Sequence, residues 1–205
     1  MKIIDCEQRS DEWYAARAGV PTASQFHRIV TPKDGLRSKQ SVAYMKELLG
    51  ELLGEQYDKG YVSAAMREGN EREVESRAAA AFAIEHEVRE VGFVTTDDGA
   101  LGCSPDGFVY QSGELIGGIE LKNKQIPAHM DVIESNQMPL EHKPQVHGSM
   151  VVTGLDQWWF ASYNPRYPDP IFLVKVTRDE YTAKVEAALR QFIAEFSDLR
   201  ERVGV

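Results

Sequence analysis

The sequence predicts an α/β fold in which helices flank a mixed central sheet and an additional helical region stands at the N-terminus. Apolar residues recur at helical spacing near both ends, and the middle of the chain contains the order helix, three strands, helix, strand. The 205 residues, 42% of them hydrophobic, can form one sizeable core. We therefore expect a single domain over residues 1–205, with an N-terminal helical part (1–60) and a core part (61–205).

The N-terminal part contains three expected helices. Ser10-Asp11-Glu12 indicates the start of a short helix with acids in its first turn, and Gly19 indicates its end. A second helix is expected from Thr22-Ala23-Ser24 to Pro32, and a loop rich in Pro, Gly and charge covers residues 31–39. A third helix follows from apolar residues at helical spacing: Val42, Met45, Leu48, Leu49, Leu52 and Leu53.

The middle of the chain predicts a long helix and then three strands. An alanine run at 78–81 favours a helix over residues 62–87. Strands are expected over 88–96, 101–110 and 114–124. Asp97-Asp98-Gly99 forms a plausible hairpin turn between the first two, and the last two join around Ser112-Gly113.

The last part predicts a helix at 141–153, strands at 157–163 and 171–176, and an amphipathic helix from 178 to about 202. The two strands are separated by turn residues at 164–168.

The composition limits the function classes. A formal net charge of −9 argues against a protein that coats nucleic acid, because phosphate neutralisation needs a basic face. It does not exclude an enzyme that reaches the backbone through metal ions, which invert the local field. Cys6 and Cys103 fit free thiols better than a disulfide, zinc or iron–sulfur site. No secretory signal or membrane span is evident, so we expect a cytoplasmic protein.

The most informative residues are Asp106, Glu120 and Lys122. Residues two apart on a strand share a face, so Glu120 and Lys122 project together while Leu121 packs on the other side. Hairpin pairing can bring Asp106 opposite Glu120. The two carboxylates, with the Leu121 backbone carbonyl, suit Mg²⁺ or Mn²⁺, and Lys122 can hold an attacking hydroxide.

Each half of this pattern is common by itself. A Glu-x-Lys pair on a strand is usually a solvated face, and Pro-Asp-Gly is a common turn. The combination, within the predicted order of strands and helices, favours a metal site over these structural interpretations.

Pro105-Asp106 followed by Glu120-Leu121-Lys122 resembles the PD-(D/E)xK nuclease signature. Several further segments resemble, in the same order, the lambda-exonuclease-like (YqaJ-type) phage recombination nucleases. They are residues 13–19, Thr22-Ala23-Ser24, residues 69–73, residues 103–107, Pro144-Gln145-Val146 and residues 159–166. The resemblance covers almost the whole chain and implies a restriction-endonuclease-like core.

The resemblance also implies roles for individual residues. Asp106, Glu120 and the Leu121 carbonyl would bind metal, and Lys122 would position the nucleophile. Glu73 would be an additional acid near the metals, favoured over Glu71, which a helix would point elsewhere. Gln145 would complete the metal site from the following helix. Arg17, Ser24 and Ser104 would form a pocket that holds a terminal 5′-phosphate.

One departure concerns this pocket. The family has an arginine where this chain has Ala128, so His129 or Lys124 substitutes for it or the pocket is weaker. Other candidates are less specific. His27, His86, His142 and His147 lack metal-ligand spacing, and Met66 and Arg67 are candidates for a wedge against the terminal base pair. One of Trp158 and Trp159 is expected in the core, and the other could cover a groove.

The implied function is a Mg²⁺-dependent 5′-to-3′ exonuclease, with Mn²⁺ as a substitute, that digests one strand of double-stranded DNA ends and leaves a 3′ single strand. A ring-shaped homotrimer and a single-strand annealing recombination protein as partner would follow, in a phage or prophage-encoded protein of a bacterial cell. The alternatives are an endonuclease of the same superfamily, an iron–sulfur relative that needs four cysteines, and a non-catalytic DNA-binding or assembly module.

Overall fold

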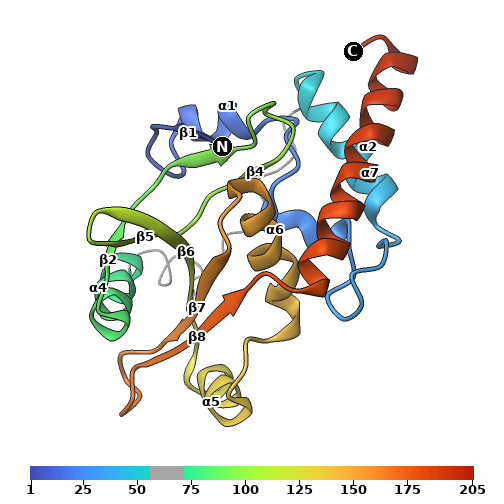
Figure 1. The fold of residues 1–205 in the computed structure, drawn as a ribbon. Helices are drawn as coiled ribbons and strands as arrows, with labels where there is room; N and C mark the ends of the chain where they lie inside the picture. Colours follow the sequence, from blue (N-terminus) through green and yellow to red (C-terminus); the bar gives the residue numbers. More distant parts are fainter. Residues whose placement is uncertain (56–71) are drawn as a thin grey trace.

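The computed structural model describes residues 1–55 and 72–205 (Figure 1). Helix α1 (Asp11–Arg17) begins as predicted, because the Ser10 side chain accepts a hydrogen bond from the backbone N–H of Trp13 at 3.2 Å. The second predicted helix is a shorter 3₁₀ helix, η1 (Ala23–Arg28). The third is α2 (Ser41–Leu52). The long helix predicted over 62–87 is α4 (Glu73–Ile84) in its described part, and the portion before residue 72 lies outside the described residues.

The central sheet has the strand order β2-β5-β6-β7-β8. Pairing is antiparallel except between β6 and β7, which run parallel, so the expected mixed sheet is confirmed. The strands are β2 (Glu87–Arg89), β5 (Gly107–Gln111), β6 (Glu114–Asn123), β7 (Gln157–Tyr163) and β8 (Ile171–Thr177).

A second, three-stranded sheet was not predicted. It consists of β1 (Lys2–Ile4), β3 (Phe93–Thr95) and β4 (Gly102–Cys103). The strands expected at 88–96 and 101–110 are therefore each divided between two sheets. The first changes sheet near Gly92, where a Cβ atom would lie 2.3 Å from the Cys6 carbonyl oxygen. The second is interrupted at Pro105, which has no N–H to donate to a ladder. The hairpin turn at 97–99 joins β3 to β4 as predicted.

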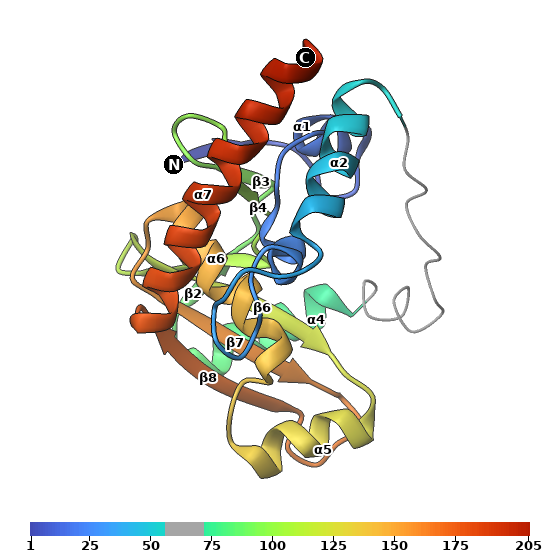
Figure 2. The same ribbon diagram turned by 90° about the vertical axis from the view of Figure 1, so that its right-hand side faces the viewer.

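The two faces of the central sheet pack against different helices. On one face Val109, Ile119, Leu121, Trp159 and Ala161 form a cluster with Ala80 of α4. The other face, which includes Phe108 and Trp158, joins the larger core with η1, α2, α6 (Lys143–Thr153) and α7 (Glu180–Val203). Figure 2 shows α6 between the sheet and the long α7. Both tryptophans of β7 are thus core residues, and neither covers a groove.

Glycines in β6 make room for these two indoles. A Cβ at Gly118 would lie 2.3 Å from the Trp158 ring, and one at Gly117 would lie 2.6 Å from the Trp159 ring. Because the rings lie on opposite faces, this pair of glycines allows both helical layers to approach the strand that carries Glu120 and Lys122.

One helix was missed by the sequence analysis, α5 (Ile126–Ser135), which has Pro127 in its first turn. A short 3₁₀ helix, η2 (Leu140–His142), leads into α6. Helix α7 begins at a capping box formed by Asp179 and Thr182. No helix within residues 1–55 and 72–205 has the length and apolar character needed to cross a membrane.

Candidate active site

Asp106 lies beside Glu120, immediately before the first residue of β5. Its backbone N–H donates to the Ile119 carbonyl at 3.2 Å, and its Oδ2 accepts from the Leu121 N–H at 2.6 Å. Glu120 is only 2% exposed, and its Oε1 is 2.5 Å from Lys122 Nζ. Leu121 packs in the cluster on the α4 face, so Glu120 and Lys122 project towards α6 as expected from strand alternation. The structure therefore brings the three predicted side chains together.

Negative charge dominates this centre. Burial raises the pKa of Asp106 well above its ordinary value, and the Glu120 carboxylate raises it further, against the effects of Lys122 and the Leu121 N–H. Burial lowers the pKa of Lys122, but Glu120 and Asp106 raise it and the net shift is upward. Lys122 is thus a stable cation that balances only part of the charge of the carboxylates, so a divalent cation would relieve their repulsion.

The donor atoms fit Mg²⁺ in kind. Leu121 directs its N–H at Asp106, and the N–H and C=O of one strand residue point to the same side, so its carbonyl oxygen also faces Asp106. In the described part of the chain, no three Asp, Glu, His or Cys side chains converge to hold an ion by themselves. Mg²⁺ commonly uses one or two carboxylates and keeps several waters, so Asp106, Glu120 and the Leu121 carbonyl would suffice to hold it.

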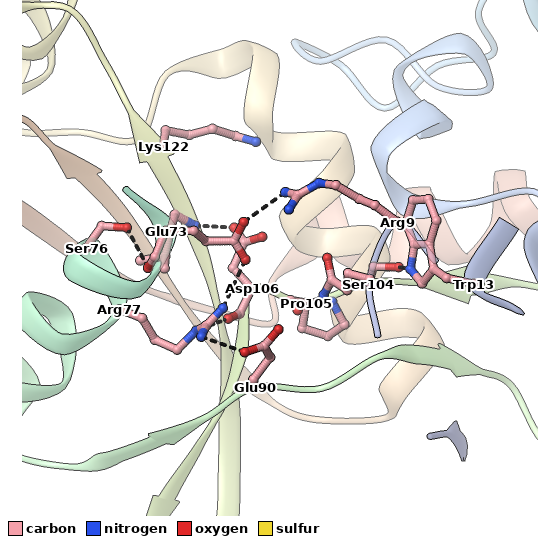
Figure 3. A network of polar contacts seen from close by, with 12 residues as sticks. Arg9, Trp13, Glu73, Ser76, Arg77, Glu90, Ser104, Pro105, Asp106 and Lys122 are labelled. Carbon is pink, nitrogen blue, oxygen red and sulfur yellow. Dashed lines mark hydrogen bonds and ion pairs between the residues drawn. The ribbon is translucent and has the colours of Figure 1, made fainter. Parts of the chain in front are cut away.

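Glu73, the first residue of α4, lies next to this centre (Figure 3). Its Oε1 pairs with Arg77 Nη2 at 2.9 Å, and its Oε2 pairs with Arg9 Nη2 at 2.8 Å. Arg77 also donates from Nε to the Asp106 carbonyl oxygen at 2.8 Å and from Nη1 to Glu90 at 2.9 Å. Arg77 therefore connects α4 to the backbone of Asp106. Neither arginine was predicted from the sequence, although the i, i+4 spacing of Glu73 and Arg77 was a usable signal.

The three residues predicted for a phosphate pocket also lie together. Arg17 donates to Ser104 Oγ at 3.1 Å and to Thr22 Oγ1 at 3.3 Å, and Thr22 Oγ1 lies 3.4 Å from Ser24 Oγ. Trp13 Nε1 donates to the same Ser104 Oγ at 2.9 Å. With both donors on its oxygen, the Ser104 hydroxyl has its own proton to offer to an anion.

The Arg17 guanidinium is held in place from several sides. It lies 4.0 Å from the centre of the Trp13 ring, one helical turn earlier on α1. Burial lowers the pKa of Arg17, although not enough to remove its charge at neutral pH. Helix α2 fixes the neighbouring loop, since Glu51 accepts from the Gly19 N–H at 2.8 Å and the Tyr44 hydroxyl accepts from the Thr22 N–H at 3.2 Å. Trp13 and Thr22 thus belong to this polar cluster, although neither was assigned a role from the sequence.

His129 does not substitute for an arginine at position 128. It is fully buried, with Nδ1 2.8 Å from Ser162 Oγ and Nε2 3.2 Å from the Asp169 carbonyl oxygen, and is therefore a structural residue. Lys124 lies on the Lys122 side of the sheet, with Nζ 3.8 Å from Glu141. The pKa of His142 is lowered to about 3, mainly because its ring is buried and further because of the positive charges of Lys122 and Lys124.

Gln145 is partly exposed in the first turn of α6. His142 immediately precedes α6, and the charge of Lys122 lowers its pKa, so this end of the helix lies near the acidic centre. Glu71, Met66 and Arg67 lie outside the described residues.

A family model and two solved structures of one exonuclease indicate the family of this chain. The YqaJ-like viral recombinase domain matches residues 12–156. An alkaline exonuclease from Laribacter hongkongensis, LHK-Exo, is 30% identical, with a TM-score of 0.76 over 95% of this chain and 98% of its own. Its complex with dAMP has a TM-score of 0.75 at the same identity and coverage. A phage-related exonuclease from Haemophilus somnus 129PT, 15% identical, has a TM-score of 0.67 over 90% of this chain and 96% of its own. No curated protein sequence matches.

These similarities confirm the restriction-endonuclease-like α/β fold and the resemblance on which the residue roles were based.

Proposed function

Because the chain belongs to the YqaJ-like viral recombinase family, we propose that it is a Mg²⁺-dependent exonuclease acting 5′ to 3′ on double-stranded DNA. It would digest one strand of a linear duplex to 5′-mononucleotides and leave a 3′ single-stranded tail. Mn²⁺ would replace Mg²⁺, since both prefer oxygen ligands.

The observation that carries this proposal is the short link between the acidic centre and the polar pocket. Ser104 belongs to the pocket through Arg17 and Trp13, and Asp106 belongs to the centre through the Leu121 N–H. Two residues of extended chain span about 6.6 Å, which is close to the spacing of successive phosphates along a DNA strand. A terminal 5′-phosphate held by Arg17 would therefore place the next phosphodiester at Asp106 and Glu120.

The chain's own groups would divide the work of hydrolysis. A Mg²⁺ held by Asp106, Glu120 and the Leu121 carbonyl would supply an acidified water and offset charge on the phosphate oxygens. Lys122 would donate a hydrogen bond to the attacking oxygen and keep it in line with phosphorus. Attack breaks the bond between phosphorus and the 3′ oxygen of the terminal nucleotide, and a proton from solvent completes its 3′ hydroxyl. Arg17 would keep the departing nucleotide in register until that bond breaks.

An endonuclease of the same superfamily is the alternative, and one assay separates the two. A linear duplex labelled in one strand is incubated with Mg²⁺, and a covalently closed circular duplex serves as the control. We expect mononucleotides from the linear duplex and no cutting of the circle. The dAMP complex of LHK-Exo supports mononucleotides as products. Internal fragments, or linearised circles, would instead support the endonuclease, and no cleavage of either would support a non-catalytic module.

For assembly, we propose a homotrimeric ring that threads DNA and a single-strand annealing protein as its partner in recombination. A ring would reconcile the net charge of −9 with processive digestion, because a locally basic channel can hold DNA that the outer surface repels. Sedimentation should report about three subunits per particle, as in closed cyclic assemblies. A processive monomer would remove the ring from the mechanism.

A further inference from the structure

Arg9 is held in an unusual backbone conformation at the edge of the acidic centre. Its φ of +72° lies in the left-handed region, which a side chain with a Cβ rarely adopts. The preceding Gln8 anchors the turn, because its Nε2 donates to the Val91 and Pro105 carbonyl oxygens at 2.8 and 2.9 Å. The following Ser10 caps α1. A strained residue fixed on both sides, next to Asp106, indicates a placement selected for function.

The Arg9 side chain is not needed to neutralise Glu73. Arg77, whose side chain is 12% exposed, already pairs with Glu73 and also binds the Asp106 carbonyl and Glu90. Within residues 1–55 and 72–205, the Arg9 side chain pairs only with Glu73 Oε2, and it is 46% exposed. Figure 3 shows this side chain extending from the side of Trp13 and Ser104 towards Glu73, with the Lys122 side chain above the acids in this view. Arg9 therefore stands between the polar pocket and the acidic centre.

We propose that Arg9 is a DNA-binding residue that exchanges Glu73 for a phosphate of the digested strand, an inference that rests on the proposed nuclease function. Solvent around the half-exposed Arg9 side chain screens its attraction to Glu73, so the pair is easily given up. Arg9 contacts Glu73 through Nη2 alone, whereas its guanidinium can bind two oxygens of a phosphate at once, which makes the phosphate the stronger partner. Glu73 remains paired with Arg77 after the exchange, so no buried carboxylate is left without a cation.

The test measures how binding depends on salt, because each arginine–phosphate contact releases counterions. A 5′-phosphorylated duplex is titrated with protein in Ca²⁺ at several NaCl concentrations, and the slope of log K against log salt is compared between variants. Arg9→Met should reduce that slope by about 0.9, and Arg9→Lys should keep it. Arg9→Gly should show the same reduced slope with an unperturbed fold, because glycine accepts the positive φ.

Arg190→Met is the matched control. Arg190 is a 78% exposed arginine on α7 that pairs with Glu186 at 2.7 Å, so this variant has the same net charge as Arg9→Met. Its slope should equal that of the wild type. An unchanged slope in both Arg9→Met and Arg9→Gly would overturn the inference while leaving the nuclease intact. A wild-type protein that does not bind duplex DNA would instead overturn the proposed function itself.

Discussion

Removal of the Arg17 guanidinium should abolish the proposed preference for a 5′-phosphorylated end. In the structure, Arg17 joins Ser104 to Thr22 and stacks on Trp13, so Arg17→Ala removes the cation and loosens its neighbours. The loosening affects every substrate equally. The loss of the cation affects only a substrate with a terminal phosphate, because that group carries more charge than an internal phosphodiester.

The size of the effect follows from the contacts that are lost. One charge-assisted hydrogen bond contributes about 1.5–3 kcal/mol, and a partly buried arginine that grips two phosphate oxygens should contribute about 2–4 kcal/mol. At about 1.4 kcal/mol per factor of ten, digestion of the phosphorylated duplex should fall by roughly 30- to 700-fold. His129 cannot soften this loss, since both of its ring nitrogens are engaged in the core.

The assay compares two proteins on two substrates. Wild type and Arg17→Ala each digest the same duplex with a 5′-phosphate or a 5′-hydroxyl, and the ratio of the four rates isolates the interaction between Arg17 and the phosphate. Any general loosening of the pocket cancels in that ratio. Equal rate losses on the two substrates would show that Arg17 is structural and would refute this account of polarity.

Three further outcomes are expected. Asp106→Asn should lower the cleavage rate at least about a thousandfold, because it removes a metal ligand. It should not lower Tm, because it also removes a buried charge that Glu120 repels. A wild-type cleavage rate would show that the metal binds elsewhere. Glu73→Ala should cost more activity than Glu71→Ala, since Glu73 neighbours Asp106, and equal losses would count against that role. Burial lowers the pKa of His147 to about 4, although the Asp179 carboxylate opposes this shift. Between pH 6.5 and 4 the imidazole is therefore protonated in the unfolded chain but not in the folded protein, and the free energy of unfolding decreases as the pH falls through this range. When the pH falls from 7.5 to 5, the free energy of unfolding measured in urea should decrease less for His147→Gln than for the wild type, by up to about 2 kcal/mol. An equal decrease in the two proteins would contradict the lowered pKa of His147.

Local patterns in the sequence predicted the centre of the fold well. The alternation of Ile119 and Leu121 with Glu120 and Lys122 identified both faces of β6, and each is found where the alternation places it. The turn at 97–99 and the cap at Ser10 were likewise visible, because the residues that make them are neighbours in the chain.

Features that depend on distant residues were not predictable in the same way. Strand β1 pairs with β3 about 90 residues later, and no local signal marks that partner. Arg9 reaches Glu73 because Gln8 fixes its turn through a contact with the distant Val91, so the spacing of Arg9 and Glu73 in the sequence carries no information. His129 lay near the expected pocket in sequence, but α5 directs it into the core against Ser162.

Because Arg17 stacks on Trp13, the fluorescence of this tryptophan should depend on what Arg17 binds. Of the three tryptophans in the chain, Trp158 and Trp159 are enclosed on opposite faces of the sheet, where a ligand cannot reach them. Trp13 alone is partly open to solvent, and its ring and N–H contact Arg17 and Ser104. An anion that bound to Arg17 and Ser104 would change the polarity around the Trp13 indole and around no other tryptophan. If the proposed 5′-phosphate site is correct, intrinsic tryptophan emission should follow phosphate binding and release in real time, without a label on protein or DNA.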